Sequence, residues 1–160
     1  MARSRAPRKE LGGMKIRFCL GWASSDIRKS FKSEAACGLF HEYTQRIDKF
    51  DHCRISNLDS EKKAGTRIWL CHTGKNAKAL SSEALAGAIQ NLRNSGTKEL
   101  RVAVGPADGF SLETIENLKP DFLWSFGPMT YPHELAAVIA AEQIYRAYAI
   151  IHRLPYHAGH

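Results

Sequence analysis

The chain has 160 residues, of which 44% are hydrophobic and 24% charged, and its formal net charge at pH 7 is +7. This length and balance suit one globular domain with a buried core, and no apolar run approaches the roughly eighteen residues of a membrane-spanning helix. The excess positive charge favours a polyanionic partner such as a nucleic acid, but charge alone does not identify one.

Residues 1–13 (MARSRAPRKELGG) differ in composition from the rest of the chain. They hold four basic residues and one acidic residue, and two glycines precede Met14. They lack the apolar core of a secretory signal, so we expect a cytoplasmic protein in which residues 14–160 form a single domain. The first segment is then a disordered extension, or it precedes a true start at Met14. A basic arm that contacts RNA phosphates is the alternative.

The four cysteines, Cys19, Cys37, Cys53 and Cys71, are widely spaced and form no CxxC motif. In a cytoplasmic protein they are expected to be reduced thiols in the core. Two of them are next to a histidine in the sequence, but neighbours on a strand point to opposite faces of the sheet. We therefore expect no metal site, because zinc needs four convergent ligands.

The first half of the chain predicts a strand, a long helix and a second strand. Residues 15–21 alternate between apolar and other side chains, which is typical of a strand. Residues 24–26 (SSD) can cap a helix, which we expect to run to about Gln45. Apolar residues spaced by four form one stripe on that helix and are expected in the core: Ile27, Phe31, Ala35, Leu39 and Tyr43. A short strand over residues 53–55 and a polar loop over residues 57–65 follow.

In the second half, strands and helices alternate. Residues 66–71 (TRIWLC) and 100–104 (LRVAV) are compact apolar runs, typical of strands buried on both faces. Helices and a further strand are predicted over residues 81–96, 111–118 and 122–126, with Ser81 or Ser82 as the first cap. The alternation predicts an α/β fold with a largely parallel sheet and helices on both faces.

Three loops follow three of the predicted buried strands, over residues 70–75, 104–109 and 126–132. Open α/β sheets bind ligands at the carboxyl ends of their strands. The loops contain glycines that let a backbone approach a ligand closely: Gly74, Gly105, Gly109 and Gly127. The sequence has no Walker lysine motif and no GxGxxG motif, so the pattern indicates a nucleotide-like ligand other than a triphosphate or a dinucleotide.

Residues 121–157 hold the most informative pattern in the chain. A strand ends at residues 127–128 (GP), and a helix pattern of about twenty residues begins shortly afterwards. Pro132 suits the first turn of that helix, because a first-turn N–H needs no partner within the helix. Thr130 or Tyr131 is expected at or near the N-cap.

Polar side chains occupy the helix and the tail after it. Glu142 and Arg146 are one helical turn apart. A simple ion pair between them is therefore the alternative to a functional role for either residue. Tyr156 and His157 close to the C-terminus favour a tail that takes part in chemistry, and a frayed tail is the alternative. His133, in the first turn, is expected to be structural.

Three motifs stand in order in this segment: residues 129–133 (MTYPH), 142–147 (EQIYRA) and 154–157 (LPYH). In them the chain closely resembles the end of the SPOUT-class large-subunit ribosomal RNA methyltransferases that methylate N3 of a pseudouridine, the RlmH type. The likeness extends more thinly to about Lys15. The resemblance implies an S-adenosylmethionine-dependent enzyme that acts on 23S ribosomal RNA of the large subunit or of the assembled ribosome.

The resemblance also implies architecture that periodicity does not reveal. SPOUT proteins thread their C-terminal segment through a loop to form a deep trefoil knot, and they form homodimers packed partly through the last helix. The aromatic and apolar face of that helix is compatible with such packing, and equally with burial inside one subunit. It holds Leu135, Val138, Ile139, Tyr145 and Tyr148.

By the same resemblance, eight residues would line the S-adenosylmethionine pocket: Leu70, Gly105, Gly127, Pro128, Met129, Thr130, Tyr131 and Pro132. Three residues would act on the RNA. Arg146 could hold a phosphate or a base oxygen, and Tyr156 could stack on the base or donate its hydroxyl. His157 could accept or relay the N3 proton.

The chain departs from the family pattern at several positions: Cys71, Val104, Ala107, Asp108, Leu154 and Ala158. The region over residues 40–65 is also shorter than in the family and lacks a basic helix. These departures keep two alternatives open, a SPOUT methyltransferase for another RNA and a non-catalytic RNA-binding protein of ribosome assembly.

Overall fold

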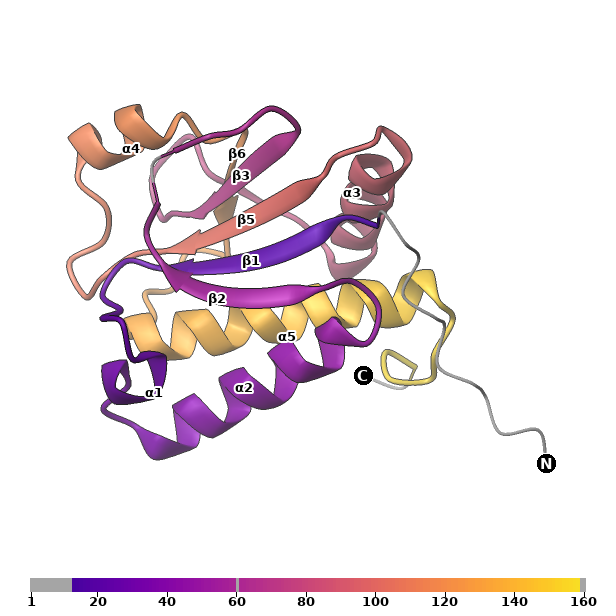
Figure 1. Ribbon diagram of the computed structural model, residues 1–160, viewed down its shortest axis with the longest axis horizontal. Coiled ribbons are helices and arrows are strands. Elements are labelled where there is room, and N and C mark those ends of the chain that lie inside the picture. The colour runs from indigo at the N-terminus through magenta and orange to yellow at the C-terminus, as the bar shows by residue number, and fades with distance from the viewer. Residues whose placement is uncertain (1–12, 60, 159–160) are drawn as a thin grey trace.

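The computed structural model describes residues 13–59 and 61–158. The basic segment predicted over residues 1–13 lies outside this part of the chain except for Gly13. Within the described residues, six strands form one parallel sheet in the order β2-β1-β5-β3-β6-β4 (Figure 1). The strands are β1 (Lys15–Leu20), β2 (Cys53–Asn57), β3 (Thr66–Cys71), β4 (Lys78–Ala79), β5 (Glu99–Val104) and β6 (Phe122–Ser125).

The helices are α1 (Ile27–Ser30), α2 (Glu34–Asp48), α3 (Ser82–Asn94), α4 (Leu112–Leu118) and α5 (His133–Ile151). Four of them begin at a residue whose side chain accepts a backbone N–H of the first turn, which satisfies a donor that the helix itself leaves unpaired. These caps are Asp26, Ser33, Ser81 and Ser111.

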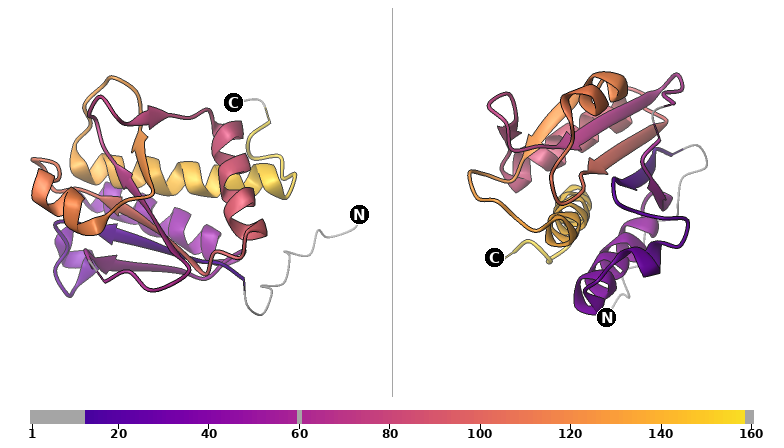
Figure 2. Two further views of the ribbon diagram at one scale, coloured as in Figure 1. Left: turned by 90° about the horizontal axis from the view of Figure 1, so that it is seen from above. Right: turned by 90° about the vertical axis from the view of Figure 1, so that its left-hand side faces the viewer.

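Helices cover both faces of the sheet, α2, α3 and α5 on one face and α4 on the other (Figures 1 and 2). The larger core contains Phe18 and Val102, which pair across β1 and β5, together with Ile144 of α5. A smaller cluster under α4 contains Leu70 and Leu118. The predicted α/β class, with a parallel sheet and helices on both faces, is therefore confirmed.

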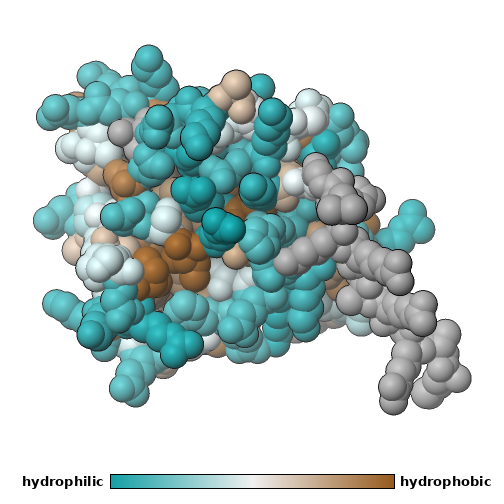
Figure 3. Space-filling view, viewed as in Figure 1, coloured by the Kyte–Doolittle hydropathy of each residue, from teal (hydrophilic) through white to brown (hydrophobic). Residues whose placement is uncertain are grey.

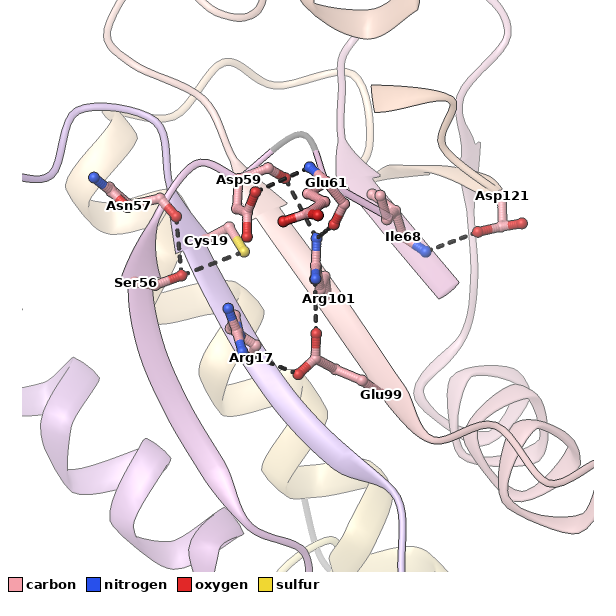
Figure 4. Close-up of polar contacts among 10 residues, drawn as sticks. All are labelled: Arg17, Cys19, Ser56, Asn57, Asp59, Glu61, Ile68, Glu99, Arg101 and Asp121. Carbon is pink, nitrogen blue, oxygen red and sulfur yellow. Dashed lines mark hydrogen bonds and ion pairs between the residues drawn. The ribbon is translucent and has the colours of Figure 1, made fainter. Parts of the chain in front are cut away.

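On the α4 side of the sheet, a buried arginine fixes the short connection between β2 and β3. Arg101 is 4% exposed, its Nε lies 2.7 Å from Glu99, and its Nη1 donates to the carbonyl oxygen of Glu61 at 2.6 Å (Figure 4). Arg17 pairs with the same Glu99 carboxylate at 3.3 Å. A buried charge needs such partners, and here they hold the backbone at Asp59 and Glu61.

The single helix predicted from residues 24–26 to about Gln45 is wrong, because the chain breaks between α1 and α2. The break is stabilised by Glu134 of α5, whose carboxylate accepts the backbone N–H groups of Lys32 and Ser33 at 3.1 and 3.0 Å. Of the predicted stripe, Phe31 is buried in the core and Ile27 and Tyr43 pack against it. Ala35 and Leu39 are exposed, Leu39 to 44%.

The start of the last helix also differs from the prediction. Pro132 occupies the N-cap position of α5, and no side chain caps this end, so neither Thr130 nor Tyr131 has that role. Tyr148 belongs to the apolar face that was predicted to pack either against a second copy or within the subunit. It is buried within the subunit, and its hydroxyl donates to Asp51. Among the described residues, no helix is long and apolar enough to cross a membrane, and no three acidic, histidine or cysteine side chains form a metal-binding group.

Candidate active site

A cleft of about 240 Å³ lies at the carboxyl ends of β3, β5 and β6, where the three predicted loops converge. Residues 71–73, 104–110 and 129–131 form most of its wall. A second hollow of about 340 Å³ adjoins it, lined by residues 79–82 and by Gln143 of α5 among others. Trp124, Phe126 and Tyr131 line both spaces.

Glycines shape these turns, and Gly109 and Gly127 both have a positive φ. Gly127 has a φ of +99°, and nothing lies within 4 Å of a Cβ placed there, so the turn needs glycine for its backbone and opens into free space. At Gly105 a Cβ would lie 3.2 Å from the Phe110 ring, so a side chain there would crowd the wall of the cleft. Ser125 tightens the turn after β6 by accepting the Gly127 N–H at 3.1 Å.

Five of the eight residues expected at the S-adenosylmethionine pocket line one or both spaces: Gly105, Gly127, Met129, Thr130 and Tyr131. The other three lie elsewhere. The side chain of Leu70 is buried on the α4 face of the sheet, and Pro132 lines a groove between α2 and α5. Pro128 is exposed at the turn and belongs to the lining of neither space.

The C-terminal tail folds back onto α5 and brings Arg146, Tyr156 and His157 together. Arg146 pairs with Glu142 through Nε at 3.0 Å and Nη2 at 2.5 Å. Its Nη1 lies 3.0 Å from Nδ1 of His157, and its guanidinium carbon lies 5.0 Å from the centre of the Tyr156 ring. The Tyr156 hydroxyl donates to Glu142 at 2.9 Å. The predicted Glu142–Arg146 pair is confirmed, and the tail is packed rather than frayed.

The chemistry of this cluster follows from its hydrogen bonds. Burial raises the pKa of the Tyr156 phenol above its usual value, and its contacts with Tyr43 and Glu142 act in the same direction. Burial opposes the charge on Arg146, but the hydrogen bond and the charge of Glu142 raise its pKa overall. Tyr156 is therefore a neutral donor and Arg146 a permanent cation. Burial also raises the pKa of Cys71 in the cleft, so its thiol is neutral.

Sequence reasoning missed two residues that connect the tail to the hollow. Gln143 accepts the Ser82 hydroxyl at 2.8 Å and donates to Glu142 at 2.8 Å. Glu83, in the first turn of α3, lies 2.8 Å from Nε2 of His157. Both contacts join α3 to the C-terminal part of the chain, and nothing local in the sequence indicates contacts across such a distance.

Comparison with known proteins identifies the family of this chain. The family model described as a predicted SPOUT methyltransferase matches residues 28–157. A solved structure of the putative methyltransferase Lpg2936 from Legionella pneumophila, in complex with bound SAM, matches at a TM-score of 0.44 and 17% identity, over 85% of this chain and 67% of that one. The chain belongs to the SPOUT methyltransferase family.

Three similar proteins have the name ribosomal RNA large subunit methyltransferase H. The protein of that name from Koribacter versatilis is 34% identical over 137 residues, which cover 81% of this chain and 92% of the relative. The one from Rhizobium etli is 33% identical over 135 residues, 79% of this chain and 81% of the relative. A shorter match to the one from Rhizobium meliloti reaches 44% identity over 80 residues, 50% of this chain and 49% of the relative. The resemblance noted in the sequence is thereby confirmed.

Proposed function

We propose that this chain is an S-adenosylmethionine-dependent methyltransferase that methylates N3 of a pseudouridine in large-subunit ribosomal RNA. The observation that carries the proposal is that two features of the fold are linked through α5. The first is a cleft at the carboxyl ends of the strands, bounded by glycine-containing turns. The second is the Arg146–Tyr156–His157 cluster, which Gln143 connects to the adjoining hollow.

The cleft and the hollow suit a cofactor of this kind. Ligand sites typically occupy about 300–1,000 Å³ and combine apolar walls with a few polar groups. The aromatic rings of Trp124, Phe126 and Tyr131 would pack against an adenine. The backbone turns at Gly105 and Gly127 allow the close approach that backbone recognition requires. When bound, S-adenosylmethionine supplies an electrophilic methyl group.

The tail residues have the properties that methylation of N3 requires. As the N–C bond forms, the N3 proton must leave and negative charge develops on the base oxygens. Arg146 is held by Glu142 and can stabilise that charge through Nη1. Tyr156 gives its one hydroxyl hydrogen to Glu142, so it can stabilise the charge when this hydroxyl turns to a base oxygen. His157 is the group placed to take the proton, since a neutral imidazole is available near neutral pH.

We also infer a homodimer that forms through the N-terminal half of α5. The groove between α2 and α5 is lined by apolar side chains that include Leu39, Leu135 and Val138. Hydrophobic side chains gather over this half of α5 in Figure 3, and such patches commonly mark interfaces. Membership of the SPOUT family supports the dimer and a C-terminal trefoil knot. A ribosomal substrate supports a cytoplasmic location.

The direct test is a mass-spectrometric comparison of ribosomal RNA from a strain with the gene and a strain without it. One methylated pseudouridine in the large-subunit RNA should disappear on deletion and return with the wild-type gene. It should not return with a His157→Ala variant. Unchanged ribosomal RNA would overturn the proposal.

A second candidate, methylation of another RNA, is favoured by the short connection between β2 and β3. There the carbonyl oxygens of Asp59 and Glu61 accept hydrogen bonds from Arg101. The described residues in the range 58–65 form neither helix nor strand. Loss of a basic helix would alter the contact with RNA. A deletion strain that lacks a methyl group in a transfer RNA instead would support this candidate.

A further inference from the structure

Both ring nitrogens of His157 are occupied, and the identity of their partners fixes the position of the ring proton. Nδ1 lies 3.0 Å from Nη1 of Arg146, and Nε2 lies 2.8 Å from Oε1 of Glu83. A guanidinium can only donate, so Nδ1 must be the acceptor. The Glu83 carboxylate can only accept, so Nε2 must carry the proton. These two contacts fit the tautomer with the hydrogen on Nε2 and the lone pair on Nδ1.

We propose that Glu83 is a positioning residue that holds the Nε2–H of His157, so that Nδ1 is the atom that takes the N3 proton. This inference rests on the proposed methyl transfer. Glu83 is then the carboxylate of a carboxylate–imidazole–substrate arrangement. In such an arrangement the carboxylate orients the ring and stabilises the imidazolium that forms. Glu83 lies on α3, far from the sequence motifs of the tail.

The contacts of Arg146 show how Nδ1 becomes available. Glu142 binds Nε and Nη2 of the guanidinium, whereas Nη1 contacts His157. When a phosphate or a base oxygen of the RNA binds Nη1, Arg146 keeps its place on Glu142 and the lone pair of Nδ1 is released. The N3 proton then moves to Nδ1, and the imidazolium passes a proton to water after the methyl group is transferred. His157 thus becomes a base when RNA is bound.

The surroundings of Glu83 suit this role. Its hydrogen bond to His157 and the backbone donors at the start of α3 lower its pKa, so it is an anion at neutral pH. The adjacent Ser82 hydroxyl donates to Gln143 of α5. The start of α3 is therefore fixed to the helix that carries Arg146. The charged and titratable groups around the ring are Glu83 from α3, Glu142 and Arg146 from α5, Tyr156 from the tail and Tyr43 from α2.

The test uses the full chain with 15N-labelled histidine and follows the ring nitrogens of His157 by NMR, with a His157→Ala sample for assignment. At neutral pH the wild-type ring should show a proton on Nε2 and an acceptor at Nδ1. A neighbouring carboxylate stabilises the imidazolium. The Glu83→Gln variant should therefore protonate its ring at a lower pH than the wild type does. The matched control is Glu113→Gln, which removes a carboxylate from the same first-turn position of α4.

Methyl transfer gives an independent second measurement. Glu83→Gln should reduce kcat by about tenfold or more and leave the affinity for S-adenosylmethionine unchanged, and Glu83→Ala should reduce kcat further because the ring loses its acceptor. A proton on Nδ1, or the same ring titration in Glu83→Gln and wild type, would overturn the assignment. Neither result would bear on whether the protein methylates RNA.

Discussion

Gly127 and Gly96 have the same backbone requirement in different surroundings. Their φ angles are +99° and +81°, and nothing lies within 4 Å of a Cβ built on either residue. Replacement of either by alanine should therefore lower the free energy of unfolding by roughly 1 kcal/mol through backbone strain. Only Gly127→Ala should also weaken the binding of S-adenosylmethionine, measured by titration calorimetry. Equal affinity in the two variants would show that the turn after β6 is not part of the pocket.

The Tyr156 hydroxyl can be removed without removing the ring. Tyr156→Phe keeps the ring under the Arg146 guanidinium but loses the donor to Glu142. Loss of one donor that stabilises developing charge typically costs about 10²–10³ in kcat, so we expect a fall of that order with little change in cofactor affinity. Tyr145→Phe is the control, because its ring lies 4.7 Å from that of Tyr156. Similar kcat values for the two variants would assign Tyr156 a packing role.

Among single residues, motifs pointed to part of the candidate site. Arg146, Tyr156 and His157 stand in the tail motifs, and the structure brings them together. Glu83 precedes His157 by 74 positions, and no local pattern links the two. Leu70 was expected at the pocket from the family resemblance, but its side chain is buried on the α4 face of the sheet.

Among the elements, strands were predicted better than helix ends. A compact apolar run such as residues 66–71 predicts a buried strand by its composition alone, and it forms β3. The break between α1 and α2 depends instead on Glu134, which lies about one hundred positions away and accepts two N–H groups there. A contact of that kind overrides a local capping signal. The tiny strand β4 (Lys78–Ala79) carries no apolar pattern and was missed.

The tail can be removed as an element. Leu154 packs against the core and its N–H donates to Ala149, so a chain that ends after Leu154 should fold normally. It should bind S-adenosylmethionine with near wild-type affinity, because the proposed pocket uses none of the missing residues. Methyl transfer should fall by at least about a hundredfold, the lower range of general acid–base contributions. A truncated protein that methylates RNA at the normal rate would exclude the tail from the reaction.

Asp121 connects the start of β6 to β3. Its carboxylate accepts the Ile68 N–H at 2.8 Å and pairs with Lys62 and Arg67 at 3.0 and 3.2 Å. Burial alone would raise its pKa, but these hydrogen bonds and charges hold the pKa below its usual 3.8. Because the folded-state pKa is the lower one, this stabilisation is present above about pH 4 and is lost as the pH falls through the folded-state value.

Asp121→Asn should therefore lower the free energy of unfolding by about 1–2 kcal/mol at pH 7 and by clearly less at pH 3. Denaturant titrations at the two pH values measure both. Asp108→Asn, in an exposed turn, is the control and should change stability little at either pH. A loss for Asp121→Asn that is independent of pH would mean that the charge is unimportant.

For the whole molecule, the groove between α2 and α5 predicts how two copies associate. Leu135 and Leu39 are each 44% exposed, and Leu112 on α4 is 79% exposed. Leu135→Glu should convert a dimer into a monomer in light scattering at micromolar concentration, because a charge buried in an apolar interface is costly. Leu112→Glu should leave the dimer intact. A wild-type monomer, or dissociation by Leu112→Glu alone, would contradict the proposed interface.

The order of the strands in the sheet also determines when the chain can fold during its synthesis. β1 is made early, but Phe18 pairs with Val102 of the much later β5, and Tyr148 of α5 reaches Asp51 across 97 positions. Contacts so distant in sequence form slowly, because loop closure must precede them. The apolar faces of β1 and α2 are uncovered until α5 has emerged from the ribosome. The ribosome is also the kind of particle that we propose this protein modifies. Nascent chains halted before α5 should consequently aggregate or bind chaperones.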